Sequence, residues 1–122
     1  MRLDIDLSDF GATDREECGI LIGRYVKKKR KVTRVVKVKN YAADPENDYA
    51  IAMLDVEAAA KNLEPGEHIV GFLHTHLDKH GARPTKADFE GAKIFPNYLN
   101  LVYKPSTGEM VWYTSTRIRS SR

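Results

Sequence analysis

The feature that most constrains the fold is a pair of strand-like segments near the amino terminus. Residues 18–26 (CGILIGRYV) are mostly apolar and partly β-branched, which is typical of a largely buried strand. Residues 31–39 (KVTRVVKVK) alternate between apolar and charged side chains, which predicts a second strand with one wet face. The basic residues between the two segments are then expected at the tip of a hairpin.

Two helices are predicted further along the chain. The first is expected to begin with Asp55 as its cap and to end before Pro65-Gly66. Its apolar residues recur at i, i+3, i+4 and i+7, the spacing of one helix face: Val56, Ala59, Ala60 and Leu63. The second helix is predicted from Thr85 to about Phe95, before Pro96.

Further strands are predicted over residues 68–74, 98–103 and 110–113, and the polar tail of residues 115–122 is expected to be frayed. The order is β-β-α-β-α-β-β. It predicts an α/β (α+β) fold, with a mixed β-sheet flanked by helices. The whole chain, residues 1–122, is expected to form one domain.

Composition bears on the cellular location of the protein. No apolar run approaches the length that spans a bilayer, and Asp4, Asp6 and Asp9 interrupt any signal-peptide core. The lone cysteine, Cys18, allows no internal disulfide and is expected to be a small core residue. We therefore expect a cytoplasmic protein with no membrane partner.

The net charge of +3 is concentrated in two clusters. One lies at the carboxyl end, and the other is at the expected hairpin tip: Lys27, Lys28, Lys29, Arg30, Lys31 and Arg34. A lysine-covered tip can simply keep a sheet edge soluble. The alternative is that residues 27–34 bind an acidic partner or nucleic acid.

His74 and His76 stand two positions apart at the end of a predicted strand. Alternation places both imidazoles on one face, in line with Val70 and Phe72. Two neutral imidazoles make half of a zinc site, although exposed histidine pairs are also common at strand ends.

Asp88 follows His76 after twelve positions, in the first turn of the second predicted helix. The spacing of Thr85 and Asp88 predicts a capping pair, and the same loop can return the Asp88 carboxylate to the strand end. Three protein ligands would leave the fourth position of one zinc ion open for water, the catalytic pattern. Such a site needs a proton acceptor, and Glu16, at the start of the first strand, is the candidate.

These residues resemble a known family. Residues 16–23 (EECGILIG) are similar to the Glu-x-x-Gly-x-x-x-Gly opening of JAMM domains, which are also called JAB or MPN+. His74-Thr-His76 and residues 82–88 (ARPTKAD) resemble the family's His-x-His and Pro-Ser-x-x-Asp signature, most closely in its short prokaryotic members. The chain departs from the pattern at Leu77, where the family has proline, at Thr85, where it has serine, and in a loop one residue longer.

The resemblance implies the cytidine-deaminase-like JAB architecture and a zinc metallopeptidase or isopeptidase. His74, His76 and Asp88 would hold one Zn²⁺ ion, and Glu16 would be general base and acid. Family register selects Glu16 over Glu17. Thr85 would stabilise the oxyanion, or serve only as a cap.

The implied substrate is the extended carboxyl-terminal tail of a ubiquitin-like or sulfur-carrier-like protein, bound as an added strand by a monomer or small homo-oligomer. Two alternatives remain open: a non-catalytic scaffold domain of the MPN type, and a nucleic-acid-associated protein that uses residues 27–34. His80, in the longer loop, is either solvated or close to the substrate or metal.

Overall fold

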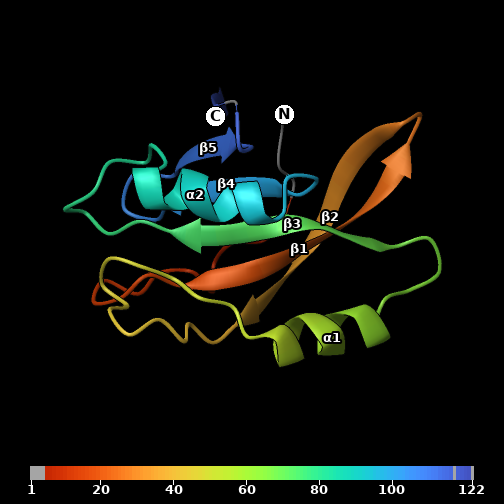
Figure 1. The fold of residues 1–122 in the computed structure, drawn as a ribbon, viewed down its shortest axis with the longest axis horizontal. Coiled ribbons are helices and arrows are strands. Elements are labelled where there is room, and N and C mark those ends of the chain that lie inside the picture. The colour runs from red at the N-terminus through yellow and green to blue at the C-terminus, as the bar shows by residue number, and fades with distance from the viewer. Residues whose placement is uncertain (1–4, 117, 122) are drawn as a thin grey trace.

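The computed structural model describes residues 5–116 and 118–121, and they contain a six-stranded sheet and two helices (Figure 1). In chain order the strands are β1 (Cys18–Val26), β2 (Lys29–Val38), β3 (His68–Thr75), β4 (Leu99–Lys104), β5 (Glu109–Tyr113) and β6 (Ile118–Ser121). They lie side by side in the order β2-β1-β3-β4-β5-β6. Of these described strands only β3 and β4 run parallel, so the predicted mixed sheet is confirmed.

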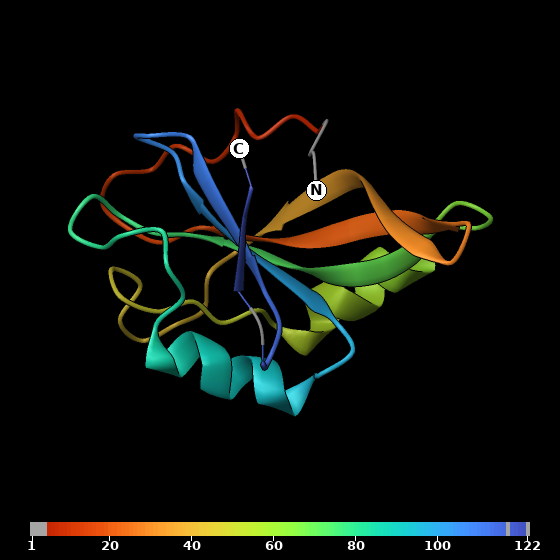
Figure 2. The same ribbon diagram turned by 90° about the horizontal axis from the view of Figure 1, so that it is seen from above.

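The two helices, α1 (Met53–Lys61) and α2 (Lys86–Ile94), lie on the same side of the sheet (Figure 2). Beneath α1, the alternate residues Ile20 and Ile22 of β1 pack with Ala59 and Phe72. Beneath α2, a smaller cluster joins Phe89, Ala92, Val102 and Tyr113. The two helices therefore cover neighbouring halves of one sheet face.

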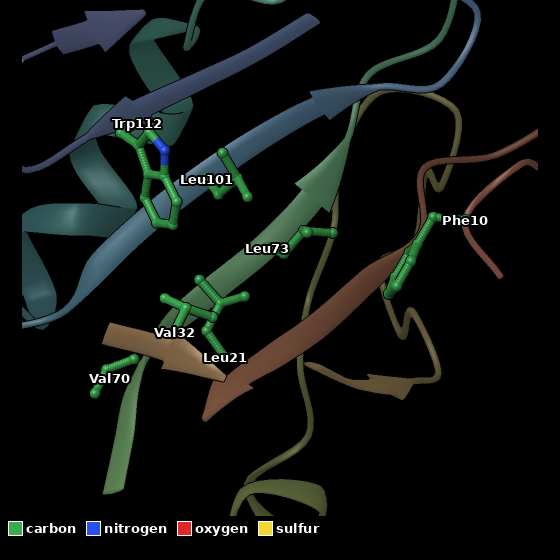
Figure 3. Packing of buried hydrophobic residues seen from close by; sticks show 7 residues of the cluster. All are labelled: Phe10, Leu21, Val32, Val70, Leu73, Leu101 and Trp112. Atoms are coloured by element: carbon green, nitrogen blue, oxygen red, sulfur yellow. The ribbon is translucent and has the colours of Figure 1, made fainter. Parts of the chain in front are cut away.

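The opposite face of the sheet buries the largest apolar cluster (Figure 3). Leu21, Leu73, Leu101 and Trp112 project from successive strands, and the segment before β1 covers them with Phe10. The period-two alternation of each strand thus separates two apolar layers.

The predicted start of the first helix is wrong. The helix begins at Met53, with Ala52 as an N-cap that offers no side-chain hydrogen bond, and Asp55 lies inside the first turn. Met53 and Leu54 are good helix formers, so the helix begins two residues before Asp55, the side chain expected to cap it. The second helix agrees with the prediction, because Thr85 is its N-cap and Phe95 its C-cap.

The predicted fraying of residues 115–122 is wrong for residues 118–121. They form β6, which pairs with β5 from Tyr113 opposite Ile118 to Met110 opposite Ser121. The free edge of β5 offers unpaired backbone groups, and the chain returns to satisfy them. Arg117 and Arg122 lie outside the described residues.

Strand β3 contains an irregularity that sequence alternation does not reveal. The register shifts because Leu21 lies opposite Gly71, whereas Ile22 lies opposite Ile69. Val70 consequently packs in the cluster of Leu21, and Ile69 packs with Phe72. Val70 therefore does not share a face with Phe72, contrary to the prediction. A bulge reverses the alternation upstream of it.

No helix among the described residues is long and apolar enough to cross a membrane.

Candidate metal centre

Two imidazoles meet at the carboxyl end of β3. His74 is fully buried and His76 almost so, and their Nε2 atoms lie 3.2 Å apart. The amide of His76 donates to the carbonyl of Tyr103 at 3.0 Å, so backbone pairing with β4 continues one residue past the strand. This pairing fixes both histidines on a rigid sheet rather than on a free loop.

The first turn of α2 brings a carboxylate to the same point. Asp88 Oδ1 lies 3.3 Å from His74 Nε2, and Asp88 Oδ2 lies 3.2 Å from His76 Nε2. A reciprocal capping box holds the Asp88 side chain, because Oδ2 accepts from the Thr85 amide at 2.8 Å and the Asp88 amide donates to Thr85 Oγ1 at 3.1 Å. The same position of the Asp88 carboxylate thus serves both the helix cap and the contacts with the two imidazoles.

The polar atoms gathered here could hold a metal ion: ligand atoms of Glu16, His74 and His76 all lie within 4.8 Å of one another, and Asp88 adjoins both histidines. With zinc–ligand distances of about 2.0–2.1 Å, two ligand atoms of a tetrahedral site stand about 3.3 Å apart. The Nε2 atoms of His74 and His76 are 3.2 Å apart, and each lies 3.2–3.3 Å from a different carboxylate oxygen of Asp88. Burial holds the pKa of His74 below its ordinary value, so its ring is neutral, with one N–H group and one nitrogen lone pair.

Asp88 is ionised in this setting. Burial raises its pKa, but hydrogen bonds from His74 and His76 outweigh burial and hold the pKa well below the usual range. For His76, burial lowers the pKa, and the Asp88 carboxylate and the Gly81 carbonyl reverse the direction, so its pKa is raised. The surroundings therefore lower the pKa of His74 and raise the pKa of His76.

Partners behind the rings set their orientation. His76 Nδ1 lies 2.7 Å from the Gly81 carbonyl, which can only accept, so Nδ1 carries a proton in both ring states. In the protonated ring Nε2 donates to Asp88, and in the neutral ring Nε2 has the lone pair that a metal ion would take. The ring of His74 stacks on Tyr49, with centroids 4.2 Å apart and planes 14° apart. Tyr113 meets the edge of His74 at a centroid distance of 6.3 Å.

A second carboxylate lies beside the imidazoles. Glu16 is buried, and one of its carboxylate oxygens lies within 4.8 Å of a ring nitrogen of both His74 and His76. Burial raises its pKa to about 7. Its backbone is fixed by the long loop before α1, because its amide donates to Pro45 and its carbonyl accepts from Asn40.

Glu17, the competing acid, is directed elsewhere. Its carboxylate accepts from the Ala12 amide at 2.8 Å and pairs with Lys37. Its backbone bonds Thr75 in both directions, with the Glu17 amide on Thr75 Oγ1 and the Thr75 amide on the Glu17 carbonyl, each at 2.8 Å. The structure therefore brings Glu16, and not Glu17, to the imidazoles.

The remaining sequence candidates lie around this cluster. Thr85 is exposed at the helix start, next to Asp88. His80 packs against His76 with ring centroids 5.9 Å apart, and its Nε2 lies 3.0 Å from Asn47 Oδ1, so it joins two loops beside the site. Cys18 is fully buried, and burial raises the pKa of its thiol to about 12, as expected for a core residue.

Sequence reasoning missed the aromatic support of the site. Tyr49 comes from a polar loop and Tyr113 from β5, and neither belongs to a local pattern that points to His74. An isolated tyrosine within the polar residues 44–50 was the only available signal.

Two hollows flank the cluster. A groove of about 490 Å³ lies between α1 and α2 and reaches Asp88, with walls that include Val56, Phe72, Phe95 and Tyr98. A smaller hollow of about 240 Å³ lies beside His76 and has a mixed lining, with polar Asp78 and Ser106 and apolar Leu77 and Pro105.

A mixed sheet that gathers two imidazoles and two carboxylates at one strand end defines an α/β protein with a candidate metal centre. The chain belongs to the family described as prokaryotic homologs of the JAB domain, which it matches over residues 9–114. This confirms the resemblance found in the sequence.

Two solved structures share the fold. A Desulfitobacterium hafniense protein is 23% identical, with a TM-score of 0.71, over 89% of this chain and 77% of that one. A Salinibacter ruber protein is 21% identical, with a TM-score of 0.57, over 98% of this chain and 89% of that one. No curated protein matches the chain.

Proposed function

We propose that the protein is a zinc-dependent hydrolase that cleaves a peptide or isopeptide bond after the carboxyl terminus of a ubiquitin-like or sulfur-carrier-like protein. The observation that carries the proposal is the convergence of His74, His76 and Asp88 at separations of 3.2–3.3 Å, with the buried Glu16 carboxylate within 4.8 Å of both imidazoles. Three ligands with one open position are the catalytic pattern for zinc.

In this proposal His74, His76 and Asp88 hold the ion. A bound zinc ion would supply a water of lowered pKa and polarise the scissile carbonyl. Glu16 accepts the proton of the attacking water and returns it to the departing amine. A carboxylate held near neutral pKa by burial suits both halves of this transfer.

Thr85 is placed to assist. Its Oγ1 already accepts the Asp88 amide, which uses one lone pair and leaves the hydroxyl proton available. Because Thr85 is exposed beside Asp88, that proton can be donated to the oxyanion that develops on the substrate carbonyl.

The groove between α1 and α2 supports a polypeptide substrate. Its walls are apolar and aromatic, and it leads to Asp88, so an extended tail with apolar side chains could lie along it. The smaller hollow beside His76 includes Asp78, whose carboxylate suits the amine side of the scissile bond. The substrate would thus cross the metal centre from one hollow to the other.

The test is zinc analysis and a cleavage assay on ubiquitin-like fusion proteins, with wild type, Glu16→Gln and Glu17→Gln. We expect one zinc ion in each protein and a loss of kcat of about 10²–10⁴-fold for Glu16→Gln alone, because general acid–base catalysis contributes about that much. Glu17→Gln is the matched control, since the amide oxygen of the substituted side chain could still accept the Ala12 amide.

Three outcomes would contradict the proposal. Equal turnover in wild type and Glu16→Gln would remove Glu16 from the mechanism. Zinc retained after His74→Ala plus His76→Ala would refute the ligand set. Zinc binding without turnover of any fusion by wild type would favour the non-catalytic scaffold of the MPN type.

A further inference from the structure

The far end of the β1–β2 hairpin extends beyond the sheet. Strand β3 pairs with β1 only from Cys18 to Gly23, so residues 24–31 pair with one another and, within the described residues, with no third strand (Figure 1). This two-stranded ribbon, residues 24–31, is here named the basic arm. It contains six cations and no acid: Arg24, Lys27, Lys28, Lys29, Arg30 and Lys31.

Two kinds of cation occur in the basic arm. The arginines are anchored to the body, since Arg24 donates to the Pro65 carbonyl at 2.7 Å and Arg30 donates to the Asn97 carbonyl at 2.8 Å. The four lysines are exposed, and within the described part of the chain none of them forms an ion pair. Arg34, in the same sequence cluster, is instead paired with Glu67 at 2.9 Å.

The turn of the basic arm is built against conformational preference. Lys27 has φ 51° and Lys28 has φ 66°, so both central residues of a two-residue hairpin loop are left-handed. Such loops favour Asn-Gly, because asparagine tolerates positive φ through local hydrogen bonds and glycine has no Cβ, whereas lysine has neither advantage. Lys31 also lies directly opposite Arg24, and like charges opposite one another weaken a ladder. The arm thus keeps its cations where neutral residues would be more stable.

Strain retained in this way points to function rather than to solubility alone. If the lysines only protected the sheet edge from association, they could lie on the strands on either side of an unstrained Asn-Gly turn and protect it equally well. Here the strained positions are themselves the lysines, and they lie exposed at the tip.

The chemistry of the arm selects the partner. Lysine is depleted at protein–protein interfaces, whereas lysine and arginine make most contacts with nucleic-acid phosphates. A two-stranded β-ribbon also has the width that the major groove of DNA admits. We propose that the basic arm docks the protein on duplex nucleic acid through the backbone phosphates, without reading the base sequence.

The arm is independent of the metal centre. His74 pairs with Cys18 at one end of the β1–β3 ladder, and the arm leaves the sheet beyond Gly23 at the other. Nucleic acid bound at the arm therefore leaves the candidate metal centre open, and loss of the arm leaves hydrolysis intact.

The experiment measures binding of a 20-base-pair DNA duplex by fluorescence anisotropy between 50 and 200 mM salt. With four phosphate contacts the logarithmic salt slope is expected at about −3.6, a loss of roughly 150-fold over this range. Lys27→Asn plus Lys28→Gly should halve the slope to about −1.8 and weaken binding at 50 mM at least about tenfold. The same variant should have a higher Tm, so weaker binding cannot be ascribed to unfolding.

A matched control removes two exposed cations from the helices, Lys61→Gln plus Lys93→Gln, and should leave the affinity within about twofold. Lys29→Gln plus Lys31→Gln tests the strand positions without touching the turn and should reproduce the lower slope. Equal losses in control and arm variants, or no duplex binding by wild type at 50 mM salt, would overturn the proposal. Tighter binding to poly-glutamate than to DNA would assign the arm to an acidic protein instead.

Discussion

The two ends of strand β3 differ in how their charged and polar side chains are placed. At its carboxyl end, His74 and His76 are buried and lie close to Glu16 and Asp88, so contacts among these side chains fix their positions. Beyond its amino end, the basic arm holds its lysines apart in water. Burial explains the contrast, because a buried charge needs a partner and an exposed charge does not. The buried end suits chemistry, and the exposed end suits long-range attraction.

Metal removal should give the largest effect and should separate the two ends. If zinc binds the folded chain at His74, His76 and Asp88, free zinc at a thousandfold over Kd adds about 4 kcal/mol to the free energy of unfolding. Chelation should therefore lower Tm and leave duplex binding by the basic arm unchanged. Calorimetry with and without chelator checks this, and an unchanged Tm would contradict the proposed ligand set.

Gly71→Ala should weaken the sheet between the two ends. A Cβ at this position would meet the Leu99 carbonyl of the parallel neighbour β4, which is backbone and cannot turn aside. The expected loss is about 3 kcal/mol of unfolding free energy. Gly91→Ala is the matched control, because nothing lies within 4 Å of its Cβ position in α2 and alanine favours helix.

Denaturant titration of both variants tests that prediction. Equal destabilisation by Gly71→Ala and Gly91→Ala would show that the close approach of β3 and β4 is not the cause.

Thr85→Ala should affect the candidate metal centre and leave the basic arm unchanged. The variant loses the capping bond to the Asp88 amide, at a cost of about 1 kcal/mol of stability. If Thr85 also donates to the oxyanion, kcat should fall as well, whereas Thr85→Ser should retain both properties. Chemical unfolding and the cleavage assay check the two parts separately. A stable but inactive Thr85→Ser would argue that the methyl group, not the hydroxyl, matters.

Glu67→Gln should give the smallest effect, near the base of the basic arm. Hydrogen bonds from Arg34, followed by one from the Glu64 amide, lower the pKa of Glu67 from 4.5 to about 2. A lowered carboxyl pKa adds stability above the ordinary value, and this stability disappears as pH falls from about 4.5 through about 2. The variant should therefore melt below wild type at pH 7 and match it near pH 2. A pH-independent gap would contradict the ionic origin.

Local signals account for the parts of the fold and site that were predicted correctly. Thr85 and Asp88 are three residues apart, so their capping box follows from the sequence alone. His74 and His76 share a face because the strand is regular between them. Period-two alternation likewise separates Glu16 from Glu17, and the structure brings only Glu16 to the imidazoles.

The missed features depend on contacts between distant segments. Val70 changes face because β1 and β3 lose register beside it, and no local pattern encodes that bulge. Tyr49 reaches His74 from a loop whose path is set by bonds to Glu16 and Asn40. Residues 118–121 form a strand only because β5 offers an open edge. Such contacts need the assembled sheet and cannot be predicted from the sequence alone.

The pairing of β1 with β3 also has a consequence for folding kinetics. The β1–β2 hairpin is local and can form in about 1–10 μs, whereas residue 18 must wait for residue 74 across a long loop. Until β3 arrives, Ile20 and Ile22 are uncovered beside an open strand edge. During that interval like charges on the exposed hairpin-tip lysines oppose the pairing of two such edges, and the proposed zinc site is not yet assembled. Refolding rates should therefore be insensitive to zinc, while unfolding rates should fall when zinc is present.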